Sequence, residues 1–593
     1  MKLLNFSIKN KNRIWVVLLL VLTSGCEQVT QFLSSEEVEA KRKQILSAGK
    51  YSPSLYTCTQ EDAPQDRKTL RRLSKVEYRN TLYALTSFLN ASDRTSLWND
   101  LQALITLVPE DASEQFKDAD VNLTQGHSDR YYDIAKEFAD FVVASNSRMT
   151  ALVGHSCITA ASPATACIDY FIDQFGLKTH RRPITSSERT IYRNFFNAET
   201  NPVRALIIRF LMSPEFLYHV ELSGADIGND TLELTSYEFA SRLSYAYLKT
   251  MPDSTLFSMA ADNSILTDTG LESALDHLLD NQRTLARQVS ADFYNQWLHL
   301  NEVPGINTSN TNAFSSFAPT FIGQEDALRD AMIEEIEDFT DLQTWDWQGS
   351  VDDLYQSRSS VTQSSLLASL YGVSTWNGAG NPPQFDESSD RSGLLSRAGM
   401  LVSGIHETGP IHRGVHIRRD ILCDDLPDPP TDLPPNSIIP PPFDPSLTTR
   451  ERTAQKTSPA QCAFCHSQIN PLGFILERFD GLGRERSQEQ IIYSNGSLGP
   501  NHSINTAVAP NIYFGDTETI SSQKQMVERM ISSKKLNLCF VKKYYMFLEK
   551  KENIDQNQCV LKGMYDALDV QGGSIYQMLR AYGRQPALRL KKI

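Results

Sequence analysis

The length, composition and charge of the chain indicate a soluble multidomain protein and argue against a nucleic-acid-binding role. Its 593 residues predict three to five folded units at roughly 100–200 residues per domain, and its 40% hydrophobic and 22% charged residues are ordinary for globular proteins. The net charge of −14 disfavours nucleic acid, whose phosphates attract a basic surface.

The N-terminus has the pattern of an export signal. Basic residues precede the unbroken apolar run Ile14–Leu22, and the small residues Thr23, Ser24 and Gly25 follow it. This run is too short to span a bilayer core of about 30 Å, so residues 1–25 are predicted to be a cleaved signal peptide.

Cys26 follows the small residues directly, which is typical of a lipobox. A diacylglycerol on its thiol and an acylated new N-terminus would anchor the protein stably, because several acyl chains are present. An ordinary signal peptide with an incidental cysteine is the alternative. The prediction is a lipid-anchored membrane protein of the bacterial cell envelope, facing the periplasm or the cell surface, with residues 26–65 as tether and linker.

Apolar side chains at helical spacing follow along most of the chain, and strand-like alternation is scarce. The fold is therefore predicted to be mainly α, with several helical domains in series. Thr185, followed by Glu188, predicts a capped helix start. Other helices are predicted over Lys68–Leu89, 130–150 and 166–178, and on apolar faces formed by Val203, Leu206, Ile207, Phe210 and Leu211, by Leu285, Val289, Phe293 and Trp297, by Leu328, Met332, Ile336 and Phe339, and by Val541, Tyr544, Tyr545 and Leu548.

Two later segments are predicted to be non-helical. Residues 372–392 are rich in Gly, Pro, Ser and Asp and indicate a linker. Residues 427–448 hold a dense run of prolines, which favours a stiff, extended chain. This segment is either a spacer or a strap across the neighbouring domain.

Cys462, Cys465 and His466 form a C-x-x-C-H motif, the signature of c-type haem attachment. The two thiols can add to the two haem vinyl groups, and the adjacent histidine can serve as proximal iron ligand. Composition predicts about 0.003 such matches by chance, so the motif is specific. The alternatives are a redox C-x-x-C with an incidental histidine, or a zinc site, which lacks a second Cys/His pair nearby.

Other residues are candidates for the surroundings of the haem. Three arginines, Arg413, Arg484 and Arg486, could pair with the haem propionates. The carbonyl of Pro471 could accept the Nδ1–H of His466 and so fix its tautomer. The sixth iron position stays open between water or substrate and a protein ligand from Met526, Met530, His502, His406, His412 or His416.

Six further cysteines remain for disulfides once Cys26, Cys462 and Cys465 are set apart, and export favours their oxidation. Six cysteines allow 15 pairings. Short separations favour Cys157 with Cys167 and Cys539 with Cys559, which leaves Cys58 with Cys423.

Several segments, in the same order, resemble one family of exported bacterial proteins, described only as strings of domains of unknown function around a cytochrome-c-like haem motif. The resemblance implies periplasmic or surface placement and one covalent haem c, but no substrate. The chain departs from the family at Asn470, where the family usually has Asp, and in the histidine-rich stretch 406–416. The similar segments are Arg71–Thr81, His180–Thr185, Ser213–Tyr218, Ala240–Tyr245, Gln296–Leu298, Arg391–Leu395, Gly409–Gly414, Ile469–Phe474 with the haem motif before it, and the stretch from Cys539 onward.

Together these features predict a redox protein that passes single electrons to a partner protein in the envelope. A haem oxidase or peroxidase with an open iron site, and a surface scaffold with a structural haem, are the alternatives. The predicted units after the tether are helical domains at 66–150, 151–200 and 201–371, the linker 372–392, a cytochrome-c-like haem domain at 393–490 and a C-terminal helical domain at 491–593.

Overall fold

The computed structural model confirms the mainly α class: of the residues that it describes, 60% are in helices and 7% in strands. The predicted signal peptide, Cys26 and nearly all of the tether lie outside the described residues. The structure describes residues 70–111, 122–307, 311–427, 442–551 and 557–592, together with Tyr56, Cys58, Phe116 and Ile554.

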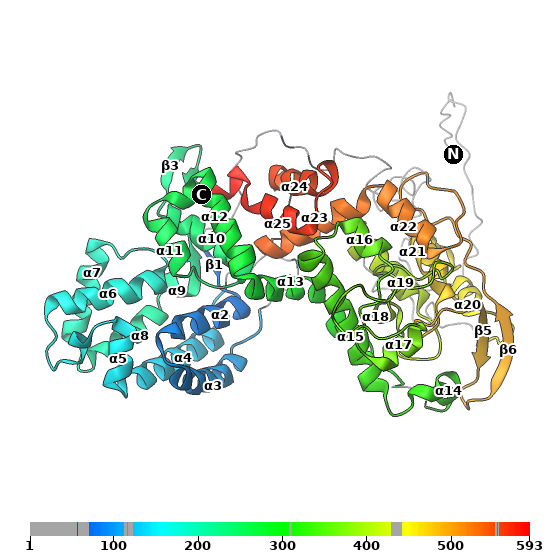
Figure 1. Cartoon of the computed structure of the whole chain (residues 1–593), viewed down its shortest axis with the longest axis horizontal. Helices are drawn as coiled ribbons and strands as arrows, with labels where there is room; N and C mark the ends of the chain where they lie inside the picture. The colour runs from blue at the N-terminus through cyan, green and yellow to red at the C-terminus, as the bar shows by residue number, and fades with distance from the viewer. Residues whose placement is uncertain are drawn as a thin grey trace, which may run out of the picture.

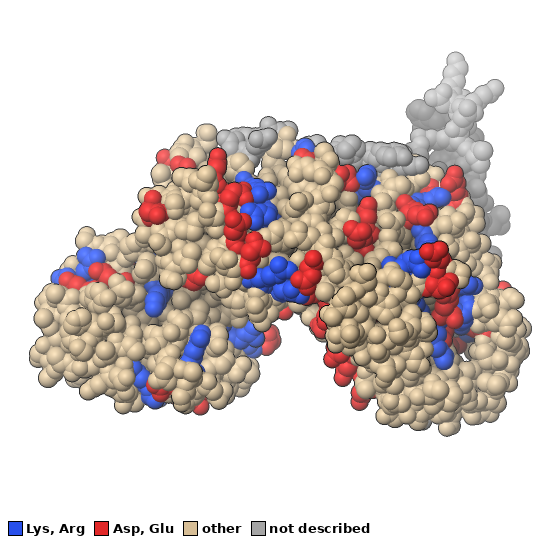
Figure 2. All heavy atoms as spheres, viewed as in Figure 1, with Lys and Arg blue, Asp and Glu red and all other residues tan. Residues whose placement is uncertain are grey.

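The described chain forms two lobes joined by a bridge of helices (Figure 1). The first lobe holds α2 to α9, the bridge holds α10 to α13 with α23 to α25, and the second lobe holds α14 to α22. The space-filling view shows the two lobes separated below the bridge (Figure 2). It also shows acidic and basic side chains side by side near the bridge. Arg580 and Arg584 of the C-terminal part of the bridge form ion pairs with Glu272 of α12.

The first lobe is a helical bundle around its own apolar core. Side chains such as Phe138, Phe171 and Phe210 are fully buried in it. The helix start predicted at Thr185 is confirmed as a capping box with Glu188. Strand β1 (Leu70–Arg72) pairs antiparallel with β2 (Tyr218–Val220) and closes the lobe. Its helices are α2 (Lys75–Leu85), α3 (Ala91–Thr106), α4 (Gln125–Val143), α5 (Asn146–Val153), α6 (Thr165–His180), α7 (Ser186–Ala198), α8 (Pro202–Leu211) and α9 (Pro214–Leu217).

The bridge brings the end of the chain back to its middle. The last strand, β7 (Leu590–Lys592), pairs with β4 (Thr231–Glu233), which pairs with β3 (Ala225–Gly228). The apolar face predicted from Val541 to Leu548 is buried, whereas Leu285 is 38% exposed and was wrongly assigned to the buried face of its helix. The helices of the bridge are α10 (Ser236–Leu248), α11 (Ser254–Ala261), α12 (Asp268–Asp276), α13 (Arg283–Trp297), α23 (Lys535–Glu549), α24 (Gln558–Tyr565) and α25 (Ile575–Gly583).

The second lobe contains the C-x-x-C-H motif on α21. The predicted loop 372–392 has no helix or named strand, and of the proline-rich segment 427–448 the part 428–441 lies outside the described residues. The elements of this lobe are α14 (Thr311–Phe317), α15 (Glu325–Asp341), α16 (Val351–Gln356), α17 (Ser365–Tyr371), α18 (Ala398–Leu401), α19 (Pro410–His416), α20 (Thr449–Lys456), α21 (Ala460–Phe474), strands β5 (Gln488–Ile492) and β6 (Leu498–Ser503), and α22 (Gln523–Ser532).

One buried apolar cluster extends through the bridge and the second lobe, from Leu234 to Leu588. It contains Trp297 of α13, Leu472 of α21 and Tyr544 of α23, so these segments share a core. The predicted domain boundaries inside this range stay predictions. In the part of the chain that the structure describes, no helix combines the length and apolarity needed to cross a bilayer.

All six predicted cysteines form disulfides, but two of the predicted pairs are wrong. Cys157–Cys167 is confirmed, whereas Cys58 bonds to Cys559 and Cys423 bonds to Cys539. The short separation of Cys539 and Cys559 is misleading because Cys539 lies near the start of α23 and Cys559 near the start of α24. The intervening turns of α23 rise about 15 Å, whereas the two Cα atoms of a disulfide lie within roughly 7 Å.

Candidate functional site

The C-x-x-C-H motif, predicted to attach haem and called the haem motif below, lies in the first turns of α21. Cys462, Cys465 and His466 are half-buried, and the i, i+3, i+4 spacing places them on one side of the helix. Cys462 and Cys465 are outside the three disulfides that take up the six cysteines discussed above. The site therefore presents two thiols and one imidazole together at the protein surface.

The imidazole of His466 is oriented by a side chain one turn further along the helix. Its Nδ1 lies 3.0 Å from Oδ1 of Asn470, and Asn470 Nδ2 donates to Thr457 Oγ1 at 2.8 Å. Because the amide nitrogen of Asn470 is used by Thr457, its oxygen accepts the Nδ1–H of His466. This tautomer leaves the lone pair of Nε2 for a metal ion.

Pro471 does not have the predicted role. It lies inside α21, and its carbonyl accepts the backbone N–H of Ile475 at the end of the helix. A helical carbonyl points along the helix axis, so it cannot reach the ring of His466. The side chain of Asn470 takes the place that the sequence suggested for the Pro471 carbonyl.

Helix α21 is held closely from one side by α19. A Cβ atom on Gly473 would lie 1.8 Å from the carbonyl oxygen of Pro410, and one on Gly414 would lie 2.2 Å from that of Ile469. Only glycine permits this approach of the two backbones. In addition, the buried guanidinium of Arg418 donates to the carbonyl of Gln468 at 2.8 Å. These contacts fix the helix that carries the haem motif.

The arginines predicted to meet haem propionates are occupied by protein groups. Arg413 is buried and donates to the carbonyls of Leu401, Leu476, Phe479 and Asp480. Burial lowers its pKa to about 10. Arg484 pairs with Asp480, and Arg486 pairs with Glu477.

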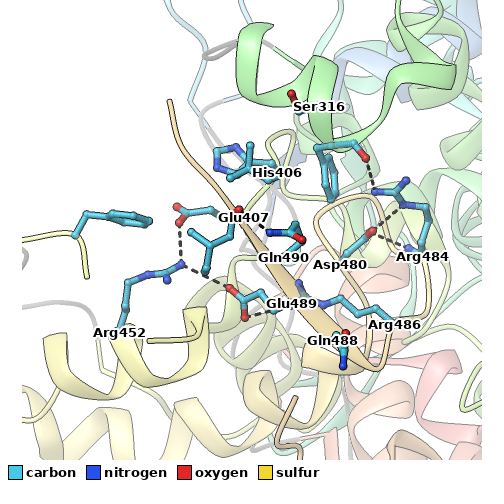
Figure 3. Close-up of a pocket in the computed structure, with 14 residues that line it drawn as sticks. Ser316, His406, Glu407, Arg452, Asp480, Arg484, Arg486, Gln488, Glu489 and Gln490 are labelled. Atoms are coloured by element: carbon cyan, nitrogen blue, oxygen red, sulfur yellow. Dashed lines mark hydrogen bonds and ion pairs between the residues drawn. The ribbon is translucent and has the colours of Figure 1, made fainter. Parts of the chain in front are cut away.

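Arg484 and Arg486 line a polar hollow of about 200 Å³ between β5, α14 and α20 (Figure 3). Arg452 reaches Glu407 and Glu489 across the same hollow (Figure 3). No side chain of α21 lines it. Each of these arginines therefore already has partners within the fold, and their pairing with haem propionates stays a prediction.

The candidates for a sixth iron ligand are dispersed. Met526 and Met530 are fully enclosed in the large apolar core, which leaves no room for a porphyrin beside them. His502 Nε2 lies 2.9 Å from the carbonyl of Pro445. His406 lines the polar hollow, and His412 and His416 line a different cavity. A filled sixth position stays a prediction.

The sequence His180-Arg181-Arg182-Pro183 of the first lobe, called the arginine motif below, has a structural role that the sequence does not reveal. Arg181 is buried in a left-handed backbone conformation and donates to the carbonyls of Glu215, Phe216 and Tyr218. The preceding His180 contacts the hydroxyl of Tyr192, and burial lowers the pKa of His180 to about 3. The segments His180–Thr185 and Ser213–Tyr218, which both resemble the family, are therefore in contact here.

The sequence did not predict one cluster of possible metal ligands. His299 and Asp420 meet His416 beside a cavity of the second lobe. Of the three, only His416 was a candidate, because the other two have no neighbouring motif in the sequence. His299 and His416 are more than a hundred residues apart in the sequence, so no local pattern indicates that they meet.

Two segments of the chain match families of unknown function. Residues 391–489 match the family PSCyt3, described as a protein of unknown function (DUF1588), and residues 234–373 match PSD4, described as a protein of unknown function (DUF1592). The comparisons with curated proteins and with solved structures gave no match. The chain is therefore similar to two families whose descriptions assign no activity, and the segment that matches the first contains Cys462, Cys465 and His466.

Proposed function

We propose that this protein is an exported bacterial lipoprotein that carries one covalent haem c and passes single electrons to a partner protein in the cell envelope. The observation that carries the proposal is the arrangement on α21. Two half-buried cysteines outside the disulfides stand beside a histidine whose Nδ1 is held by Asn470. The name of the matching family, PSCyt3, is consistent with a relation to cytochromes.

The side chains fit the chemistry of haem attachment. Sγ of Cys462 and Sγ of Cys465 would bond to the vinyl groups as thioethers, and Nε2 of His466 would ligate the iron. The Asn470 side chain would fix the orientation of the imidazole ring and so the direction in which Nε2 approaches the iron. When bound, haem supplies one-electron chemistry whose potential depends on its ligands and their hydrogen bonds.

A haem oxidase or peroxidase is the second candidate, and one observation favours it. Met526 and Met530 are enclosed in the core, and His502 and His416 contact other protein groups. An iron without a ligand from these residues would be open to a small molecule.

The ferric and ferrous spectra of the mature protein decide between the two candidates. Low-spin iron that binds carbon monoxide and cyanide slowly supports electron transfer. High-spin iron that binds them rapidly supports the oxidase or peroxidase. Replacement of a true sixth ligand should turn the iron high-spin and leave the haem covalently bound.

Export and lipidation form a separate part of the proposal. Three disulfides are consistent with folding in an oxidising compartment. Mass spectrometry of the membrane-extracted protein should find Cys26 as an acylated N-terminus. A mature N-terminus elsewhere, with unmodified Cys26, would exclude the lipid anchor and leave the haem proposal intact.

A further inference from the structure

Two histidines and one aspartate meet at the end of α19. His299 follows α13, His416 ends α19, and Asp420 lies one turn later in the π-helical turn η9 (Ile417–Ile421). Asp420 Oδ2 lies 3.4 Å from Nε2 of His299 and 3.3 Å from Nδ1 of His416. One ligand atom from each of the three residues falls within 4.8 Å of the others.

We propose that these residues form a mononuclear site for a divalent transition metal, of the zinc or ferrous class. Two imidazoles and one carboxylate on one side of an ion are the ligand set of catalytic zinc sites and of non-haem iron sites. A metal ion between the three side chains would replace the two long hydrogen bonds that now join the imidazoles to Asp420. The proposal is independent of haem binding.

The groups around the three ligands suit this role. Glu302 Oε1 lies 3.3 Å from Nδ1 of His299, so it can orient that ring with Nε2 toward the metal. Lys543 Nζ lies 3.1 Å from Oδ1 of Asp420 and leaves Oδ2 for the ion. The indole of Trp297 donates to the backbone carbonyl of Asp420 at 2.7 Å and fixes this turn.

The local backbone has features that accompany functional sites. His299 has a φ of +55°, a left-handed conformation that costs free energy in a residue with a side chain. Asp420 lies in a π-helical turn, and such turns occur frequently at functional sites.

The site opens on a cavity of about 760 Å³ that all three residues line. Most of its other lining is apolar, with side chains such as Leu298, Val303 and Ile411. Three protein ligands leave coordination positions that face this cavity, as in metal sites that bind water or a small substrate. The geometry therefore points to a metal site that binds exogenous ligands rather than to a closed structural one.

Zinc binding by the mature, full-length protein tests the proposal. The protein is stripped with a chelator, dialysed against micromolar zinc and analysed for zinc by mass spectrometry, which haem iron does not disturb. About one zinc per chain is expected, with nitrogen and oxygen neighbours near 2.0–2.2 Å in the zinc X-ray absorption spectrum. Anaerobic competition with ferrous iron then tells which metal binds more tightly. Failure of the wild type to retain zinc or ferrous iron would overturn the site.

Variants locate the metal. His299→Ala and Asp420→Asn should each abolish retention of the metal, and Glu302→Gln should weaken its affinity by about 10- to 100-fold. His406→Ala, which changes a histidine of the polar hollow, is the control and should retain zinc. Circular dichroism establishes that each variant is folded. Undiminished zinc in folded His299→Ala and Asp420→Asn would overturn the assignment, since the metal would then lie elsewhere.

Discussion

The arginine motif of the first lobe and the haem motif of the second lobe are built in opposite ways. Arg181 is buried, and its donors are used by main-chain carbonyls of a neighbouring segment. Cys462, Cys465 and His466 are half-buried, and Asn470 holds only one nitrogen of the imidazole. The first motif joins parts of the fold, whereas the second leaves reactive atoms accessible.

The same contrast applies to Arg413, one of the arginines predicted to meet a haem propionate. Arg413 lies close to the haem motif in the fold, since its helix packs against α21, yet it behaves like Arg181 of the first lobe. Both arginines donate hydrogen bonds to backbone carbonyls of segments that are distant in sequence. Removal of Arg181 or Arg413 should therefore reduce stability, whereas removal of a residue of the haem motif should change cofactor chemistry.

The largest expected effect on stability distinguishes the disulfide of the first lobe from a disulfide that joins the second lobe to the bridge. Cys423–Cys539 closes a loop of 116 residues, and Cys157–Cys167 closes one of 10. The chain-entropy model gives about 5 kcal/mol for the long loop and about 3 kcal/mol for the short one. Denaturation curves of two double variants measure the two contributions. One variant combines Cys423→Ala with Cys539→Ala, and the other combines Cys157→Ala with Cys167→Ala. Equal losses would show that loop length does not govern their contributions.

Arg181→Met should destabilise the first lobe by about 3 kcal/mol, because several buried carbonyls lose their donor. The adjacent Arg182 provides a matched control. It forms a partly exposed ion pair with Glu188, and Arg182→Met should cost about 1 kcal/mol or less. Urea denaturation followed by circular dichroism compares the two. A larger effect at Arg182 would contradict the structural role of Arg181.

The first lobe should lose stability in acid. Burial lowers the pKa of His180 to about 3 and that of His219 to about 4, below the value of about 6.5 in the unfolded chain. The unfolded state therefore binds more protons between these values, so stability is full above pH 6.5 and falls as the pH decreases toward 4. His180→Gln should reduce the slope with which stability decreases as the pH falls.

The slope is measured as the denaturation midpoint against pH. His155→Gln, at an exposed histidine of the same lobe, is the control. A slope that is the same in wild type and His180→Gln would show that protonation of His180 does not destabilise the folded state.

The smallest expected effect concerns the haem motif and is measured as a reduction potential. Asn470→Asp places a carboxylate beside Nδ1 of His466, which raises the basicity of the imidazole and should lower the reduction potential of the haem. Ser467→Ala, at an exposed position of α21, should leave it unchanged. Redox titration measures both. A raised potential in Asn470→Asp would contradict the hydrogen bond assigned to Asn470.

Local patterns predicted local structure well. The capped helix start at Thr185 and the buried face Leu328, Met332, Ile336 and Phe339 follow from spacing along one helix, and the structure confirms both. The Cys157–Cys167 pair was also predictable, because a short loop limits the choice of partner. Each of these features depends on neighbours within a few turns.

Contacts between distant segments were not predictable. Cys58–Cys559 joins residues 501 positions apart, and His299 meets Asp420 across more than a hundred residues. Nothing in either segment marks its partner. Haem attachment at Cys462, Cys465 and His466 stays a prediction. For the group beside the imidazole, the sequence favoured the Pro471 carbonyl, whereas the Asn470 side chain lies there, because sequence separation does not tell which group points at the ring.

The most direct test of the central claim is peptide mass spectrometry of the mature protein after denaturation and alkylation. One haem should be found on the peptide that contains Cys462 and Cys465, with neither thiol alkylated. The variant Cys462→Ala with Cys465→Ala should carry no haem and keep the denaturation midpoint of the first lobe. Alkylation of both thiols in the wild type, with no haem on that peptide, would contradict haem attachment at α21.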